Sequence, residues 1–178
     1  KWFFYPAQFW SHKNHIYLID TLTILKNKNI NNIGFVFSGK DNGNLEYIKK
    51  KINSNDLNEN IKILGFLSEQ QIISLYKYSA GVVIPTYVGR SSLPLLESVF
   101  FNKKIIYGKD ILDDELKKYV EEVDLNNANE LSLKLANYDL DSVKYDSNSY
   151  NEICSKESFI NVYTDIIDKF NFIRKKWE

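Results

Sequence analysis

Short apolar segments alternate with segments of helical spacing from residue 2 to residue 107, and this alternation leaves few folds open. Five apolar, β-branched or aromatic runs, each bounded by turn residues, have the length of buried strands: 2–6, 33–38, 61–64, 81–85 and 104–107. Apolar side chains between the first four runs recur with a helical period at Ile16, Ile19, Leu22 and Leu25, at Leu45, Ile48 and Ile52, and at Ile72, Leu75 and Tyr76. Because parallel strands need long crossovers, this order predicts a mostly parallel sheet covered by helices on both faces.

The pattern continues with less regularity in the rest of the chain. We expect a helix at 112–122, a short strand at 123–125 and a helix that begins at Ala128 and is capped by Asn127. A polar surface connection at 138–151 and a long last helix at 156–176 are expected to follow. The predicted fold class is therefore α/β: a Rossmann-like parallel sheet of five or six strands with helices on both faces, plus a long C-terminal helix.

Two helix starts are marked in the sequence. Ser68 is followed three residues later by Gln71, which is the pattern of a capping box. Pro94 follows a loop and is expected as a first helical residue, where the missing N–H costs nothing. Both starts therefore place a loop directly before a helix.

The composition suits one globular domain and argues against several classes of protein. The 178 residues are 44% hydrophobic and 26% charged, which is ordinary for a single core. A net charge of zero and a pI near 6.9 argue against a nucleic-acid partner. Cys154 is the only cysteine, so an internal disulfide is excluded and a reducing cytosol is favoured. No apolar run approaches the roughly 18 residues that span a bilayer.

The start of the chain differs from an ordinary translated N-terminus. Lys1 lies directly before the first apolar run, and the sequence contains no methionine. We therefore expect a piece of a longer polypeptide, with further chain before the first strand.

The first segment with chemical potential is 4–15, which reads FYPAQFWSHKNH. An apolar strand runs into a polar, cation-bearing loop that opens a helix. Rossmann-like half-domains receive phosphates at this place, because free N–H groups and the helix dipole favour anions there.

The second segment is 85–97, which reads PTYVGRSSLPLLE. Strand, loop and helix N-terminus again follow in order. The free amides of Ser92, Leu93 and Leu95 are expected to point at an anion, with the helix dipole behind them.

Together, these two segments resemble the C-terminal domains of retaining, nucleotide-sugar-dependent glycosyltransferases of the two-domain GT-B fold, of the family 4 or group 1 type. The resemblance runs from Trp2 to about Ala136. It implies that Lys13 binds the donor diphosphate and that Glu97 holds the ribose hydroxyls, and it gives both the catalytic roles. It assigns substrate binding to Gln8, Gly39, Lys40, Gly65, Phe66, Leu67, Gly89, Arg90, Ser91, Ser92 and Leu93.

Two weaker segments complete the implied pocket. Residues 63–68 resemble the family's strand-to-helix turn that reads the nucleobase, with Phe66 beside the ring. Residues 38–43 resemble the exit loop of the second strand near the phosphates. All four segments follow predicted parallel strands, and ligands of open α/β sheets bind at the carboxyl ends of such strands.

The sequence departs from the family pattern at two positions. Gln8 stands where many relatives have an arginine, and Gly89 stands where counting back from Glu97 places a glutamate. A neutral hydrogen bond contributes about 1 kcal/mol against about 1.5–3 kcal/mol for a charge-assisted one, so diphosphate binding is expected to be weaker. Arg90 offers a cation that partly compensates.

His12 and His15 have a spacing that invites a metal site. No second histidine pair and no nearby cysteine accompany them, so no metal site is predicted. We expect the two imidazoles to shape the loop and cap the helix. The resemblance likewise implies no metal and no cofactor, because protein cations and helix ends stabilise the leaving diphosphate in such enzymes.

The predicted function is transfer of a sugar, with retention, from a nucleoside-diphosphate sugar to a glycan or lipid-linked acceptor. Residues 1–178 would be the C-terminal donor-binding half, inactive without the N-terminal acceptor domain. The resemblance implies a cytoplasmic protein, peripheral at the inner membrane face when full length.

Two alternatives belong to other classes. The first is a non-catalytic nucleotide-sugar-binding or scaffold module of the same fold, because both motif departures remove charged groups. The second is a response-regulator-like domain. It is disfavoured because no acidic cluster follows the first strand.

Overall fold

The computed structural model describes two compact units, Lys1–Lys144 and Tyr145–Glu178, which are treated separately. The described residues are 1–89, 93–139, 147–154, 164, 167–169 and 172. The predicted helix over 156–176 therefore lies mostly outside them.

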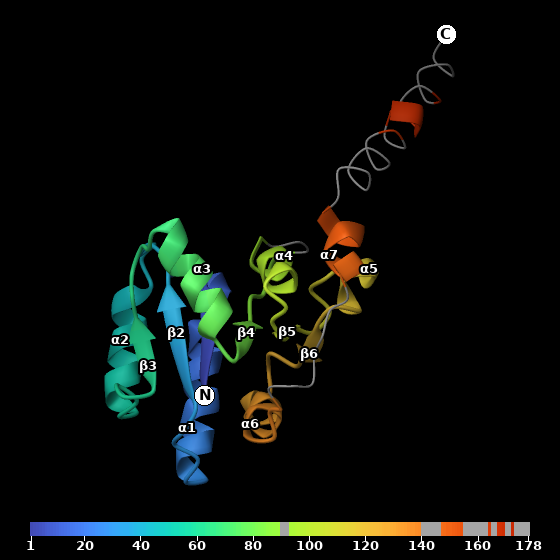
Figure 1. Ribbon diagram of the computed structural model, residues 1–178. Helices are drawn as coiled ribbons and strands as arrows, with labels where there is room; N and C mark the ends of the chain where they lie inside the picture. The colour runs from blue at the N-terminus through green and yellow to red at the C-terminus, as the bar shows by residue number, and fades with distance from the viewer. Residues whose placement is uncertain (90–92, 140–146, 155–163, 165–166, 170–171, 173–178) are drawn as a thin grey trace. The chain divides into compact units, whose positions relative to one another are not determined.

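Six parallel strands form one sheet in the order β3-β2-β1-β4-β5-β6 (Figure 1). Their bounds are Trp2–Pro6 (β1), Gly34–Ser38 (β2), Ile61–Ile63 (β3), Gly81–Ile84 (β4), Ile105–Gly108 (β5) and Glu121–Val123 (β6). The five strands predicted first are confirmed with their ends within one residue. The sixth strand is confirmed too, but it lies earlier than 123–125.

Helices connect the strands and cover the sheet. They are α1 (His15–Asn27), α2 (Leu45–Ser54), α3 (Glu69–Tyr78), α4 (Leu93–Phe100), α5 (Asp114–Lys117) and α6 (Ala128–Ala136), with a 3-10 turn η1 (Ser11–Lys13) before α1. Because βαβ crossovers are right-handed, α1 and α2 lie on one face and α3, α4 and α5 on the other. Helix α6 packs against α1.

The central strand β1 shows why this sheet forms. Phe3, Phe4 and Tyr5 are all buried, as a parallel strand covered on both faces requires. Phe4 meets Tyr76 of α3 edge to face at 5.1 Å. On the opposite face, the Tyr5 ring lies 4.8 Å from that of His15 in α1. Successive side chains of β1 thus hold the two helical layers.

The region after β5 differs most from the predictions. Helix α5 is a single turn rather than a helix over 112–122, because β6 already begins at Glu121 and pairs with β5. Helix α6 begins at Ala128 as predicted, but the Asn127 side chain makes no capping bond. Glu130 reaches back instead and accepts a 3.1 Å hydrogen bond from the N–H of Asp124.

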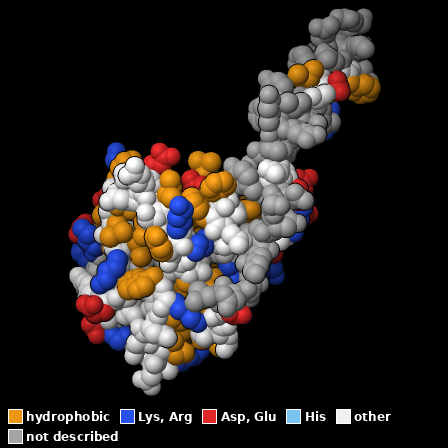
Figure 2. Space-filling view, viewed as in Figure 1, with side chains coloured by type: hydrophobic (Ala, Val, Ile, Leu, Met, Phe, Trp, Pro, Cys, Tyr) orange, Lys and Arg blue, Asp and Glu red, His pale blue; other side chains and the backbone are white. Residues whose placement is uncertain are grey.

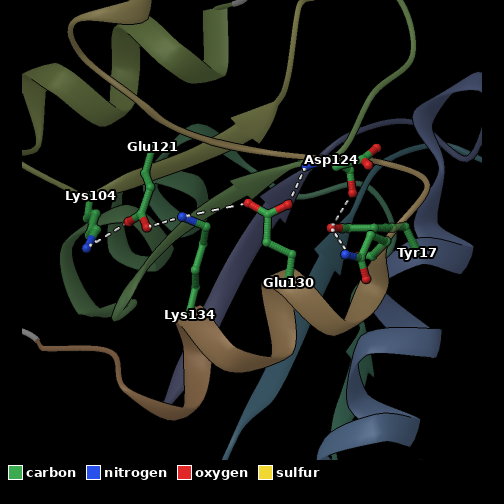
Figure 3. Close-up of polar contacts among 7 residues, drawn as sticks. Tyr17, Lys104, Glu121, Asp124, Glu130 and Lys134 are labelled. Carbon is green, nitrogen blue, oxygen red and sulfur yellow. Dashed lines mark hydrogen bonds and ion pairs between the residues drawn. The ribbon is translucent and has the colours of Figure 1, made fainter.

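Ion pairs and hydrogen bonds hold the edge strand β6 in place (Figure 3). Glu121 accepts from Lys104 at 2.9 Å and from Lys134 of α6 at 2.7 Å. The Tyr17 hydroxyl of α1 donates to the carbonyl of Asp124 at 3.0 Å. The partly exposed strand β6 and the Asp124 that follows it are therefore fixed by polar contacts from α1, α6 and Lys104.

The second unit contains α7 (Ser147–Cys154). This helix overlaps the segment 138–151, so the predicted surface connection is wrong from residue 147 on. Ser and Asn at the start of α7 obscure its helical character, because these residues suit helix N-termini as well as loops.

The viewed face of the molecule carries hydrophobic, basic and acidic side chains interspersed with one another (Figure 2). Among the described residues, exposed large apolar side chains include Phe66, which is 89% exposed in the loop between β3 and α3. None of the helices in the described part of the chain combines the length and apolar character needed to cross a membrane.

Candidate functional site

A crevice opens where the strand order reverses. β1 and β4 are hydrogen-bonded neighbours although two strands separate them in sequence. The loops that follow them diverge to opposite faces, and ligands of open α/β sheets bind at this switch point. A cavity of about 320 Å³ lies there, lined by parts of segments 5–13 and 84–94 and by Tyr107 of β5.

The loop after β1 is shaped by its own sequence. Pro6 is the last residue of the strand, and the following residues curl into η1. Asn14 then adopts a left-handed conformation with φ of 55°, which asparagine tolerates better than most residues. The Tyr5 hydroxyl donates to the Lys13 carbonyl at 2.7 Å, so the buried strand holds the end of the turn.

Lys13 is the cation of this cavity among the lining residues that the structure describes. Its side chain is half-buried, and burial lowers the pKa of its ammonium. No carboxylate of the described residues lies within ion-pair distance of it. A partly desolvated ammonium without a protein counterion is stabilised when an anion enters the cavity.

The loop after β4 is tied to the first loop and to β5. The N–H of Tyr87 donates to the His12 carbonyl at 3.0 Å. The Thr86 hydroxyl donates to the Val88 carbonyl at 2.8 Å, and the Tyr107 hydroxyl donates to the Gly89 carbonyl at 3.0 Å. Both walls of the cavity are therefore braced by hydrogen bonds.

Gly89 lines the cavity in a conformation that L-residues rarely adopt, with φ of 125°. A glutamate at this position would need a different backbone path. The departure predicted at Gly89 would therefore affect the backbone of the loop as well as its charge. Arg90, Ser91 and Ser92 lie outside the described residues, whereas Leu93 is 72% exposed at the start of α4.

Glu97 lies one turn into α4 and does not line the cavity that contains Lys13. Its Oε2 accepts a 2.6 Å hydrogen bond from the hydroxyl of Tyr76. Burial raises the pKa of that phenol, and the hydrogen bond to Glu97 acts in the same direction. Tyr76 therefore stays protonated and donates. No other donor of the described residues occupies Oε1 of Glu97. Pro94 is the second residue of α4 rather than the first.

The exit loops of β2 and β3 join the same edge of the sheet. The N–H of Phe9 donates to the Lys40 carbonyl at 2.9 Å, and the N–H of Gly39 donates to the Gly65 carbonyl at 2.8 Å. Gly39 is required here, because a Cβ would strike the carbonyl of Ala7. The four segments predicted from the sequence are thus brought to one edge.

Several predicted site residues nevertheless lie outside the 320 Å³ cavity. Besides Glu97 and Leu93, they are Gly39, Lys40, Gly65, Phe66 and Leu67. Leu67 lines a shallower depression of about 670 Å³ with Leu64 and residues of α3. The capping box of Ser68 and Gln71 beside this depression is confirmed.

His15 has a structural position rather than a capping one. Its ring is fully buried and lies 4.9 Å from that of Phe9 and 5.0 Å from that of Phe37. Burial lowers the pKa of His15 to about 3; the Lys13 charge acts in the same direction and the Ala7 carbonyl against it. Neither ring nitrogen makes a hydrogen bond of normal geometry with the described residues. The imidazole is a neutral core group, and the expectation that it caps the helix is wrong.

The sequence did not single out two partners of Gln8, Trp10 in the lining of the cavity and Asn42 outside it. Trp10 donates through Nε1 to Oε1 of Gln8 at 3.1 Å, and Asn42 donates through Nδ2 to the same oxygen at 2.7 Å. Both lie within segments that the sequence singled out, but their role depends on a contact between the β1 and β2 loops. The pairing of Phe9 with Asp41 brings these loops together.

Comparison with known proteins identifies the family and the fold of this chain. Residues 1–111 match the sequence model of the family described as Glycosyl transferases group 1. No curated protein matches the chain. Similar solved structures include a glycosyltransferase from Rickettsia africae, at 23% identity and a TM-score of 0.65 over 76% of this chain and 36% of that one.

Two further structures extend the comparison. HepE from Anabaena, solved with UDP and also with UDP-glucose, is 14% identical with a TM-score of 0.65 over 76% of this chain and 38% of its own. The apo lipopolysaccharide outer core galactosyltransferase WaaB is 14% identical with a TM-score of 0.71 over 94% of this chain and 49% of its own. These likenesses establish the shared fold, and the chain spans less than half the length of each protein.

Proposed function

This chain belongs to the glycosyl transferases group 1 family, and we propose that it is the donor-binding half of a retaining glycosyltransferase. The donor would be a nucleoside-diphosphate sugar, and the acceptor a glycan or a lipid-linked glycan. Complexes of a fold neighbour with UDP and UDP-glucose support the donor class.

The observation that carries the proposal is the half-buried ammonium of Lys13 at the switch point of the sheet. It faces a cavity and has no carboxylate partner among the described residues. Sugar transfer builds negative charge on the departing diphosphate while the sugar passes through an oxocarbenium-like state. A fixed cation beside the diphosphate stabilises that transition state more than the ground state.

The rest of the nucleotide would extend along the sheet edge. Glu97 would hold the ribose hydroxyls through Oε1, and the turn at 65–67 would contact the base. Gln8 and Lys40 would serve the phosphate side together with the backbone at Gly39, Gly89 and 90–93. A nucleoside diphosphate is long enough to contact several loops, so Lys13 and Glu97 need not share one cavity. We expect no bound metal in this arrangement.

The acceptor and any group that deprotonates it would belong to an N-terminal domain of the same polypeptide. The chain covers 36–49% of the lengths of the three compared structures, which supports a second half of similar size. On its own the chain would bind donor and transfer nothing. The full protein would be cytoplasmic and peripheral at the inner membrane face, where lipid-linked acceptors lie.

A second candidate is a nucleotide-sugar-binding or scaffold module without catalysis. The conformation of Gly89 favours it, because the loop no longer presents a carboxylate where the family pattern has one. The two candidates differ in the full-length protein. Donor hydrolysis or transfer that is lost in Lys13→Ala and Glu97→Ala identifies the enzyme, whereas biological activity that survives both substitutions identifies the scaffold.

Titration calorimetry of the 178-residue chain tests nucleotide binding directly. UDP and GDP are titrated first without metal and then with magnesium. We expect metal-independent binding of one of them, weakened about 10- to 100-fold by Lys13→Ala because a charge-assisted contact is lost. Lys50→Ala removes an exposed charge on α2 and is the matched control, with affinity unchanged. Equal affinity in Lys13→Ala and the control would contradict the proposal.

A further inference from the structure

The side-chain amide of Gln8 is held by two donors. Its Oε1 accepts from Nε1 of Trp10 at 3.1 Å and from Nδ2 of Asn42 at 2.7 Å. Gln8 lines the same cavity as Lys13. It also occupies the position where many relatives of this family carry an arginine.

The direction of the amide follows from the chemistry of its partners. An indole N–H can only donate, so the Gln8 atom that faces Trp10 must be the oxygen. Asn42 must then present its NH₂ group to that oxygen. The Lys40 carbonyl, 3.4 Å from the same nitrogen of Asn42, favours the same orientation. One unambiguous donor therefore sets the orientation of both amides.

Both donors are held by the surrounding structure. The Trp10 ring stacks on His12 with 6.1 Å between ring centroids and an angle of 25°. Asn42 follows Lys40, whose carbonyl accepts from the N–H of Phe9, and it precedes Gly43, whose N–H donates to Oδ1 of Asp41. The amide is thus oriented by groups that belong to two joined loops.

The consequence lies at the other end of the amide. Two donors occupy Oε1, and Nε2 of Gln8 has no acceptor among the residues that the structure describes. Were the amide reversed, its oxygen would face an entering anion and repel it. In the observed orientation Nε2 is the end of the amide that remains for a ligand of the cavity that Gln8 and Lys13 both line.

We propose that Trp10 and Asn42 are positioning residues that hold the NH₂ group of Gln8 toward the donor diphosphate. Gln8 then donates a hydrogen bond to a phosphate oxygen beside Lys13. The arginine of the family pattern needs no such device, because a guanidinium donates from every nitrogen. A glutamine needs a fixed amide. This inference rests on the proposed function, since it takes the diphosphate as the ligand.

Nucleotide titrations test the positioning role in the 178-residue chain. Asn42→Leu and Trp10→Phe are each expected to weaken the binding of UDP or GDP, whichever the wild type binds, about three- to tenfold. The corresponding nucleoside, which lacks phosphate, should bind with unchanged affinity. Trp2→Phe replaces an indole at the opposite end of β1 and should change neither affinity. Equal loss for nucleotide and nucleoside would show a merely structural role and overturn the inference.

A double-mutant cycle makes the test specific to Gln8. Gln8→Leu should weaken binding of the nucleoside diphosphate by about the same factor. Adding Asn42→Leu to the Gln8→Leu variant should weaken this binding no further. Gln8→Glu should bind the diphosphate more weakly than Gln8→Leu does, because Trp10 and Asn42 would hold one carboxylate oxygen and turn the other toward the phosphate. Additive losses would show that Asn42 acts independently of Gln8 and would also overturn the inference.

NMR measures the hydrogen bond between Trp10 and Gln8 without ligand. The indole N–H resonance assigned to Trp10 should shift and exchange faster in Gln8→Leu, while that of Trp2 stays unchanged. A wild type that binds no nucleotide at millimolar concentration would overturn the proposed function and this inference with it. Nucleotide binding that is weakened by Lys13→Ala but not by Asn42→Leu would overturn this inference alone.

Discussion

The hydroxyl of Tyr76 donates a 2.6 Å hydrogen bond to Oε2 of Glu97. Tyr76 is fully buried, stacked on Phe101 at 5.3 Å and edge-on to Phe4 of the central strand. The Glu97 carboxylate of α4 is therefore oriented by a tyrosine whose ring belongs to the core. Among the described residues no donor occupies Oε1 of Glu97, which leaves this oxygen for a ligand hydroxyl.

Tyr76→Phe should weaken nucleotide binding through the ribose. The ring keeps its packing, but Glu97 loses the donor that orients it, so we expect roughly three- to tenfold weaker UDP or GDP binding. The informative comparison is with the 2′-deoxy nucleotide. Its affinity should change less, and the ratio of the two affinities should fall toward one. An unchanged ratio would show that Glu97 does not contact the ribose.

His15 should make folding sensitive to acid. Its pKa is about 3 in the folded protein and about 6.5 in an unfolded chain, so between these values the unfolded chain binds more protons. The free energy of unfolding should be unaffected by His15 above pH 6.5 and fall below it, with a slope approaching about 1.4 kcal/mol per pH unit until pH 3.

Urea titrations of the wild type and His15→Phe between pH 7.5 and 4 measure this contribution. If the His15→Phe variant is less stable than the wild type at pH 7.5, the two profiles should converge as the pH falls. If the two proteins are equally stable at pH 7.5, the profiles should diverge. The difference between them should change with pH only below 6.5. Parallel profiles would show that His15 does not titrate with unfolding.

Glu121→Gln should loosen the edge of the sheet. Burial raises the pKa of Glu121, but the hydrogen bonds from Lys134 and Lys104 outweigh it and the pKa is lowered. We expect a loss of about 1 kcal/mol at pH 7, because two charge-assisted contacts become neutral at a partly exposed site.

The same contribution should vanish in acid. Because the pKa of Glu121 is lower in the folded protein, this residue stabilises the fold fully at pH values above its unfolded pKa of about 4.3. The stabilisation is lost as the pH falls through the folded pKa. Wild type and Glu121→Gln should thus approach equal stability below pH 4. Glu59→Gln, in the exposed 3.7 Å pair with Lys62, is the control with little effect.

Gly89→Glu should not restore a functional carboxylate. With φ of 125° at this position, a side chain strains the loop by about 1–3 kcal/mol. We expect lower thermal stability and no gain in nucleotide affinity. Gly43→Ala, at φ of 95° in open space, reports the cost of a strained glycine away from the cavity. Improved affinity in Gly89→Glu would show that the loop readily accepts the family pattern.

Much of the fold was readable from local patterns. The five main strands were located by short apolar runs, because parallel strands covered on both faces are mostly apolar. The edge strand β3 keeps apolar residues on either side of the exposed Lys62. Strand β6 and helix α5 were misplaced for the opposite reason. Only Val123 of β6 is buried, so its position depends on pairing with β5 and on ion pairs with Lys104 and Lys134.

For the candidate site, the sequence alone identified the loops and the residue types that meet an anion, because strand, polar loop and helix start follow one another along the chain. Only the tertiary structure showed which groups meet. Lys13 and Gln8 share a cavity, Glu97 pairs with Tyr76, and Trp10 and Asn42 hold Gln8. These contacts join segments distant in sequence, and no local spacing encodes the direction of a side-chain amide.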